Sequence, residues 1–273
     1  MNQSNANHGR HDAVAVRSRP RWAAAERFQR TEWSGVRAAL RGITRRAVIL
    51  VAALQPFLVI PANAALTITG TRVIYHEASK SVIVPVTNLD NQPVLVQSWI
   101  TNAQNEDDPA IPFAIAEPLF KVEPDRSSDV RIFYAGQGMP SDRESMMFLN
   151  IMGIPVKPTQ QNTVQFAIKQ RLKLFYRPNA LSGSVSDAVA ALRWQTKRDQ
   201  IEVTNASPFH VSLIDLDLQW QGGHRAISDY LLLEPGATQV FDATVTHTVG
   251  PLRMRFVEIN DVGLQVPHEV DLP

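Results

Sequence analysis

The 273-residue sequence contains no cysteine, and only 7% of its residues are aromatic. Without cysteine the chain can form neither disulfide bonds nor a thiolate zinc site, so its domains must be held together by packing alone. The most apolar stretch, residues 47–64, is interrupted by Gln55, Pro56 and Pro61. It is therefore shorter than the ~20 consecutive apolar residues that a stable membrane-spanning helix needs.

The motifs of the common enzyme classes are also missing. The seven histidines are scattered, without an HExxH pair, and each is expected to be a surface or turn residue. Residues 136–138 (Gly-Gln-Gly) begin like a phosphate loop, but Met139-Pro140-Ser141 follows where a third glycine and a helix are required. No GxSxG motif occurs, and Glu106-Asp107-Asp108 is typical of a solvated loop. The sequence predicts no catalytic residue, metal or cofactor, although catalytic groups can converge from distant positions.

Charge is distributed unevenly along the chain. Residues 1–46 contain ten arginines and three acidic residues, and the uncharged stretch 47–64 then ends in Ala62-Asn63-Ala64. A basic segment, an apolar segment and small residues in this order are typical of a secretory signal peptide. Cleavage is predicted between Ala64 and Ala65, with an uncleaved anchor as the alternative.

The basic segment is longer than an ordinary leader, which indicates an extended leader or a misassigned start codon. Thr44-Arg45-Arg46 only faintly resembles a twin-arginine signal, because arginine pairs are frequent in basic leaders; the choice between Sec and Tat export stays open. Residues 65–273 contain 17 basic and 23 acidic side chains, a net charge of −6. This charge argues against nucleic acid as a partner, because phosphate binding draws on clustered positive charge.

From Ala65 onward, short apolar runs alternate with the period of β-strands and are separated by turn residues. The first set of predicted strands covers residues 66–75, 81–86, 94–100, 130–134, 147–151 and 164–176. The second set covers residues 201–205, 211–218, 230–233, 239–241 and 252–259. Two sets of this size predict an all-β protein with two immunoglobulin-like β-sandwich domains.

The alternation stops at residues 179–187, where small polar residues predominate, as is typical of a linker. We therefore expect a leader and signal peptide at 1–64, a first domain at 65–178, a linker at 179–187 and a second domain at 188–273.

Residues 162–178, with the sequence NTVQFAIKQRLKLFYRP, are the most informative segment. Val164, Phe166 and Ile168 share one face of the predicted strand. By itself this pattern is typical of a half-buried core strand, and a binding edge is the alternative.

The end of this segment, Lys173-Leu174-Phe175-Tyr176-Arg177-Pro178, resembles the motif that closes the first domain of PapD-type pilus chaperones. Other matches follow in the family's order: residues 71–75, 97–99, 118–124, 142–145 (Asp-Arg-Glu-Ser), 148–151 and 154–155, and more loosely 205–209 and 260–263. The short, cysteine-free segment between Ile151 and Val164 resembles the short-loop branch of that family. Cleavage after Ala64 would make Arg72 the eighth mature residue, where the family keeps its anchor arginine.

The resemblance implies two domains in an L-shaped arrangement and a non-enzymatic periplasmic chaperone. Such a chaperone stabilises pilus or fimbrial subunits by donor-strand complementation and delivers them to an outer-membrane usher. The residues that the resemblance assigns are the anchor for the subunit's C-terminal carboxylate (Arg72 and Lys173), the donor strand (Val164, Phe166 and Ile168) and an interdomain salt-bridge network (Glu144, Arg177 and Asp261).

An exposed apolar strand also invites self-association, so the free protein is expected to cap itself as a homodimer. Two hypotheses from other classes stay open at this point. A pilus subunit would also be exported and immunoglobulin-like, but two domains and the lack of cysteine disfavour it. A secreted β-sandwich enzyme would need a convergent acid–base or metal cluster in the folded chain.

Overall fold

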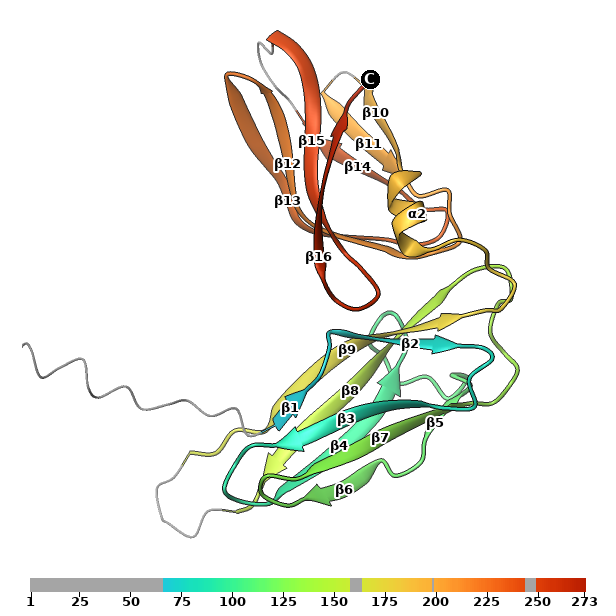
Figure 1. Ribbon diagram of the computed structural model, residues 1–273, viewed down its shortest axis with the longest axis vertical. Coiled ribbons are helices and arrows are strands. Elements are labelled where there is room, and N and C mark those ends of the chain that lie inside the picture. Colours follow the sequence, from blue (N-terminus) through green and yellow to red (C-terminus); the bar gives the residue numbers. More distant parts are fainter. Residues whose placement is uncertain (1–65, 158–163, 198, 244–248) are drawn as a thin grey trace, which may run out of the picture. The chain divides into compact units, whose positions relative to one another are not determined.

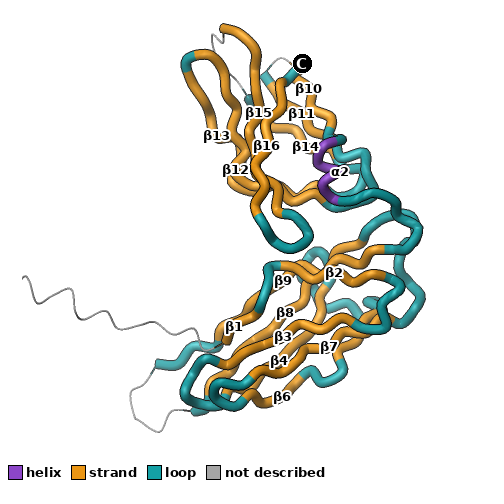
Figure 2. Tube along the Cα trace, in the orientation of Figure 1, coloured by secondary structure: helices purple, strands orange, loops and turns teal. Residues whose placement is uncertain are grey.

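The computed structural model describes residues 66–273, apart from 158–163, Arg198 and 244–248. The predicted leader, its cleavage site and part of the predicted short loop lie outside the described residues. The described chain consists mainly of strands, and α2 (Val185–Ala190) is the one helix in it (Figures 1 and 2). No helix in this described part is long and apolar enough to cross a membrane.

Nine strands form the first domain as two packed sheets (Figure 1). The strands are β1 (Leu66–Ile68), β2 (Arg72–His76), β3 (Val82–Asn88), β4 (Val94–Thr101), β5 (Phe113–Ile115), β6 (Leu119–Val122), β7 (Ser127–Tyr134), β8 (Ser145–Pro155) and β9 (Ile168–Arg177). The sheet orders are β1-β3-β7-β5 and β2-β9-β8-β4-β6. Between the sheets lies an apolar core in which Val86, Ile132, Leu149 and Leu174 are fully buried.

The second domain has its own two sheets and its own core. Its strands are β10 (Arg193–Lys197), β11 (Gln200–Thr204), β12 (Val211–Gln221), β13 (Gly223–Leu233), β14 (Thr238–Asp242), β15 (Val249–Ile259) and β16 (Gln265–Asp271). The sheet orders are β10-β11-β14 and β13-β12-β15-β16, and Ile201, Val203, Leu213 and Leu218 are fully buried between them. The all-β prediction with two sandwich domains is confirmed.

The predicted first strand, residues 66–75, is wrong as a single element. β1 pairs antiparallel with β3, whereas β2 pairs parallel with β9 in the other sheet. Gly70 lies between β1 and β2, where the chain passes from one sheet to the other. Its φ of +88° is a backbone conformation that glycine adopts without steric cost. This crossing between sheets places Arg72 directly opposite Lys173 in the register of β2 and β9.

The predicted strand at 164–176 is also too long at its N-terminal end. Pairing of β9 with β8 begins at Ile168, opposite Gly153, and β8 ends at Pro155, whose nitrogen carries no hydrogen to continue a ladder. Val164 and Phe166 therefore precede the strand. On its other side β9 is paired with β2 only from Lys173 onward, so residues 168–172 form a free strand edge among the described residues.

Helix α2 begins inside the range expected as linker. The Ser184 hydroxyl accepts a hydrogen bond from the Asp187 amide, and the Asp187 carboxylate accepts one from the Ser184 amide. This reciprocal capping stabilises the first turn of a helix that sequence periodicity did not predict, because six residues are too few to show a helical period.

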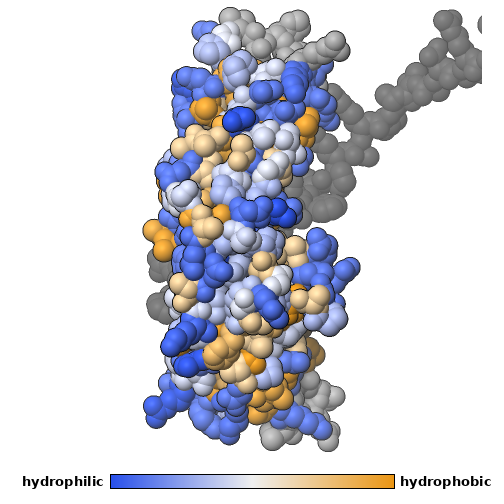
Figure 3. Space-filling model, turned by 90° about the vertical axis from the view of Figure 1, so that its right-hand side faces the viewer, coloured by the Kyte–Doolittle hydropathy of each residue, from blue (hydrophilic) through white to orange (hydrophobic). Residues whose placement is uncertain are grey.

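Apolar side chains are also exposed on the surface. Figure 3 shows one face on which they lie scattered among hydrophilic residues and gather mainly in its lower part. The most exposed large apolar side chains are Val164 at 76%, Phe166 at 75% and Val262 at 73%. Two of these three are neighbours on one segment, and neighbouring exposed apolar residues mark binding sites more often than single ones do.

Candidate functional site

The predicted donor residues continue the inward-facing side of β9 beyond the core. Leu172 and Leu174 on that side are buried, whereas Ile168 is 54% exposed, and Val164 and Phe166 are more exposed still. Side chains two residues apart point to the same face of an extended chain. The segment thus presents an apolar row that the protein's own core does not cover.

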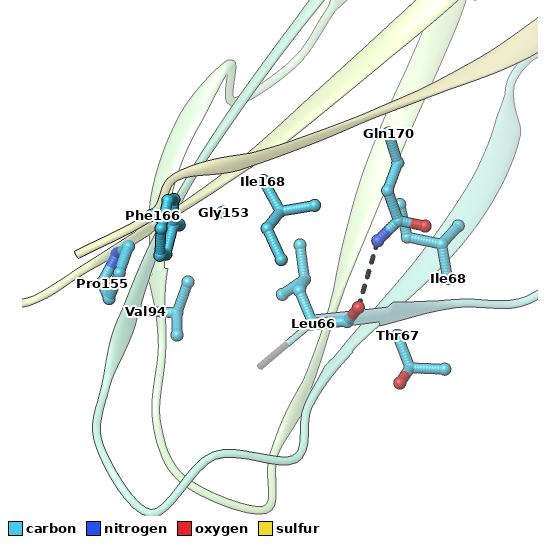
Figure 4. A pocket seen from close by; sticks show the side chains of 9 residues that line it. All are labelled: Leu66, Thr67, Ile68, Val94, Gly153, Pro155, Phe166, Ile168 and Gln170. Carbon is cyan, nitrogen blue, oxygen red and sulfur yellow. Dashed lines mark hydrogen bonds between the residues drawn. The ribbon is translucent and has the colours of Figure 1, made fainter. Parts of the chain in front are cut away.

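A groove of about 350 Å³ runs beside this row (Figure 4). Phe166 and Ile168 line it together with Leu66, Val94 and Pro155. The groove lies between β9 and β1, which is at the edge of the other sheet and pairs only with β3 in the described chain.

The two strand edges at the groove are joined by a side chain. Gln170 Nε2 donates a hydrogen bond of 3.1 Å to the Leu66 carbonyl oxygen (Figure 4). No backbone ladder joins β1 to β9 among the described residues. The sandwich is therefore open at this corner, with unpaired backbone groups on both sides.

The predicted anchor residues lie at the end of the free edge. Arg72 Nη1 donates a 2.6 Å hydrogen bond to the carbonyl oxygen of Ile259. Lys173 Nζ donates one of 3.2 Å to the buried Ser212 hydroxyl and lies 4.7 Å from the centre of the Tyr230 ring. These two cations of the first domain are thus each held by neutral groups of the second.

Neither cation has an anionic partner among the described residues. In the part of the chain that the structure describes, no carboxylate oxygen lies within 4.0 Å of Arg72 or Lys173, and Arg72 Nε is buried without a hydrogen-bond partner. Burial and the neighbouring Arg72 lower the pKa of Lys173 to about 8. Burial also lowers the pKa of Arg72, although the charge of Asp261 opposes this shift. Two partly desolvated cations without a counter-ion form a site that a bound anion would stabilise.

Arg177 shows the opposite arrangement. Its guanidinium lies 2.7 Å from Glu144 Oε1 and 2.6 Å from Asp261 Oδ2. Burial opposes ionisation of Arg177, but the hydrogen bonds to Asp261 and Glu144 raise its pKa. The structure thus brings together the three residues expected to form a network, two from the first domain and Asp261 from the β15–β16 turn.

His210 belongs to the same cluster, and the expectation that every histidine is a surface or turn residue is wrong for it. Only 7% of His210 is exposed. Its amide donates a 2.8 Å hydrogen bond to Glu144 Oε2, and its Nδ1 lies 3.0 Å from the same oxygen. Nδ1 must carry the proton to donate to this carboxylate. Nothing in the sequence links residues 66 positions apart, so the contact could be found only from the fold.

Ser212 and Tyr230, which hold Lys173, were also not predicted. Both lie on strands whose residues carry no motif of their own. Among the described residues no group of three His, Cys, Asp or Glu side chains could hold a metal ion.

Two family models match the two domains in turn. The model described as "Pili and flagellar-assembly chaperone, PapD N-terminal domain" matches residues 65–182, and "Pili assembly chaperone PapD, C-terminal domain" matches residues 187–270. The chain belongs to the PapD family of pilus-assembly chaperones. Membership in the PapD family favours the chaperone over the pilus-subunit hypothesis.

Curated relatives agree with the PapD assignment. The chaperone protein FimB/FhaD of Bordetella pertussis is 34% identical over 239 residues, which cover 84% of this chain and 95% of that protein. The chaperone protein HifB of Haemophilus influenzae is 35% identical over 212 residues, covering 74% of this chain and 86% of HifB.

Solved structures of PapD-like chaperones also match. The crystal structure of the YadV chaperone, a protein found in Escherichia coli, has a TM-score of 0.65 and 31% identity, covering 77% of this chain and 100% of YadV. A structure of the Salmonella enterica SafA pilin in complex with the SafB chaperone has a TM-score of 0.65 and 28% identity, covering 78% of this chain and 98% of the matched one.

Proposed function

We propose that this protein is a non-enzymatic periplasmic chaperone that captures pilus subunits at the free edge of β9 and passes them to an outer-membrane usher. Similarity to proteins named fimbrial chaperones supports this proposal, as does the likeness to a chaperone solved with a pilin. The main support is the pair Arg72 and Lys173. These cations have no counter-ion among the described residues, and they lie at the end of the free edge that follows the exposed apolar row.

The topology of β9 explains why the ligand of the cation pair is a chain terminus. An added strand can pair along residues 168–172, but from Lys173 onward β2 already occupies that edge. The added strand must therefore end near Lys173. A strand antiparallel to β9 would bring its amino terminus there, and a parallel strand its carboxylate. Arg72 and Lys173 select the carboxylate by charge, so the client strand runs parallel to β9.

The apolar row supplies most of the binding energy. Pilus subunits are incomplete immunoglobulin folds that lack a strand, and donor-strand complementation fills the gap. Val164, Phe166 and Ile168 would enter the client's open core, each contributing about 1.5–3 kcal/mol before the cost of ordering the segment. The anchor sets the register, because a slip of one residue would turn all three side chains away.

The test is capture of a pilus subunit from the same bacterium, co-expressed in the periplasm. Arg72→Ala and Lys173→Ala should each remove most captured subunit while circular dichroism shows a folded chaperone, because a lost hydrogen bond to a charged group costs about 1.5–3 kcal/mol. Arg131→Ala is the matched control, since Arg131 is an exposed cation on β7 of the other sheet. Wild-type capture by both anchor variants would contradict the proposed anchor.

In the absence of a client, we propose that a second copy of the chain covers the exposed row. Val164 and Phe166 are too exposed to be stabilised by the protein's own core. Self-pairing of the free edge at residues 168–172 would satisfy its backbone groups and bury the row. The short-loop assignment stays a prediction, because residues 158–163 lie outside the described chain.

A further inference from the structure

The outward face of β9 carries a column of cations. Lys169, Arg171 and Lys173 alternate with the inward-facing residues and point away from the core. Lys169 and Arg171 are exposed and lie on the free edge. Lys173 at the end of the column belongs to the anchor, so the first two cations extend a positively charged line from it.

Lys169 and Arg171 are both positioned by aromatic rings. Lys169 Nζ lies 5.8 Å from the centre of the Trp99 ring, and Arg171 Cζ lies 4.6 Å from the centre of the Phe148 ring. Such contacts are worth about 0.5–1 kcal/mol at exposed sites and restrict where the charge sits. The charges are therefore partly preorganised before any partner arrives.

The neighbouring strands of this sheet provide no counter-charge. β8 and β4 contain no charged residue, and β9 contains no acidic one. Some other exposed cations of the protein do have a carboxylate partner: Lys121 pairs with Glu123, Lys197 with Glu202 and Arg253 with Asp271. Within the described chain, neither Lys169 nor Arg171 lies within 4.0 Å of a carboxylate, in contrast to those paired cations.

We propose that the client's C-terminal strand carries acidic side chains that face Lys169 and Arg171. This inference rests on the proposed function, in which that strand runs parallel to β9 and ends at Lys173. Neighbouring strands of one sheet point their side chains to the same two faces, with a period of two residues. The acidic residues are therefore expected at alternate positions within about the last six residues of the client.

The attraction between Lys169, Arg171 and the client's acidic residues should act chiefly on the rate and selectivity of capture. Charges at the rim of an interface raise association rates and discriminate against like-charged partners, and salt screens them. The anchor and the apolar row would hold any client that ends correctly, whereas this column would favour clients that are acidic beside the free edge.

The experiment uses the mature protein and synthetic 12-residue peptides of alternating apolar and polar residues. The polar positions near the C-terminus carry Glu, Gln or Lys, and each peptide is made with a free or an amidated terminus. Affinity is measured by fluorescence anisotropy at low and high salt. The Glu peptide should bind about tenfold more tightly than the Lys peptide at low salt, and the difference should shrink as ionic strength rises.

Replacing both cations, as Lys169→Gln with Arg171→Gln, should abolish the discrimination between Glu and Lys peptides. Lys121→Gln, on β6 of the same sheet, is the matched control and should preserve it. Equal binding of the three free-terminus peptides to the wild type would overturn this inference and leave the anchor intact. If amidation of the C-terminus does not change the affinity, or if no peptide binds, the proposed anchor is wrong. The inference about Lys169 and Arg171 is then wrong as well, because it rests on that anchor.

The same pair can be tested on a folded client. Lys169→Glu with Arg171→Glu should slow capture of a subunit that carries acidic residues near its C-terminus by about tenfold at low salt. Unchanged, salt-independent capture of such a subunit would also overturn the inference.

Discussion

Three buried or half-buried basic residues, Arg72, Lys173 and Arg177, differ mainly in what surrounds them. Arg177 lies between two carboxylates, whereas the hydrogen bonds that the side chains of Arg72 and Lys173 donate within the described chain go to neutral groups. Structural cations are normally paired, because an uncompensated charge in a poorly hydrated place destabilises the fold. Arg72 and Lys173 thus lower the stability of the free fold at a site that is suited to binding an anion. Such a trade-off between stability and function is common at functional sites.

This compromise predicts that removing Lys173 stabilises the free protein. The pKa of Lys173 in the fold is about 8, below the ordinary value of 10.5, so the unfolded chain holds the proton more tightly. Below pH 8 the charged form therefore costs stability, and the cost disappears as pH rises from about 8 toward 10.5.

Lys173→Met should raise the free energy of unfolding at pH 7 by about 1 kcal/mol, after allowance for solvent screening. Urea denaturation at pH 7 and at pH 10 measures the change, which should be smaller at the higher pH. Lys121→Met, which removes an exposed lysine, serves as control. A destabilised Lys173→Met protein at pH 7 would show that the cation is structural.

At the scale of elements, the decisive feature is that β9 is paired on both sides only along its C-terminal half. The fully paired half, from Lys173, carries the buried Leu174 and Tyr176. The half with the free edge begins at Ile168 and is preceded by the exposed row. In the proposed function, this strand is therefore both a core element of its own domain and the donor for a client.

The exposed row leads to a prediction for Phe166→Glu. A charge at this position should prevent burial in a client's core, so subunit capture should fall at least tenfold, and self-association of the free protein should weaken as well. Size-exclusion chromatography and co-purification measure the two effects. Val262→Glu is the matched control, because Val262 is equally exposed but lies in the β15–β16 turn. Capture that survives Phe166→Glu would place the client contact elsewhere.

For the whole molecule, Glu144 is the residue on which contacts of both domains converge. It is 2% exposed, and Arg177 of the first domain and His210 of the second both donate to its carboxylate. Its own amide also donates to the carbonyl oxygen of Pro208. Such a buried and fully bonded carboxylate holds its partners in one geometry.

Glu144→Gln should therefore be strongly destabilising. The substitution leaves Arg177 with one carboxylate and weakens the hydrogen bonds from His210, so the free energy of unfolding should fall by about 3 kcal/mol. Denaturation monitored by tryptophan fluorescence measures the loss. Asp142→Asn, two residues away on the exposed surface, should change stability by less than about 0.5 kcal/mol. Equal effects of the two variants would mean that Glu144 does not join the domains energetically.

Export is the remaining prediction for the whole chain. We expect the periplasmic protein to begin at Ala65, because the uncharged stretch ends in Ala62-Asn63-Ala64. Mass spectrometry of protein from a periplasmic extract checks the mass. An intact leader on that protein would support the anchored alternative.

Period-two alternation, turn residues and the length of the chain were enough to predict an all-β protein of two sandwich domains. The resemblance of its motifs to the PapD family also indicated Arg72, Lys173 and the apolar row as site residues, because such motifs can be recognised from local order along the chain. Sequence patterns failed where the outcome depended on pairing partners: the division of the first strand at Gly70, and the start of β9 at Ile168.

Only the tertiary structure decided which charges are paired. The resemblance assigned Arg177 to a salt-bridge network and Lys173 to an anchor, but the fold alone gives the neutral partners of Lys173, which are Ser212 and Tyr230. Those partners come from strands distant in sequence, and His210 reaches Glu144 in the same way. Local preferences of the chain determined the strands, whereas burial and charge compensation depend on distances that exist only once the strands are assembled.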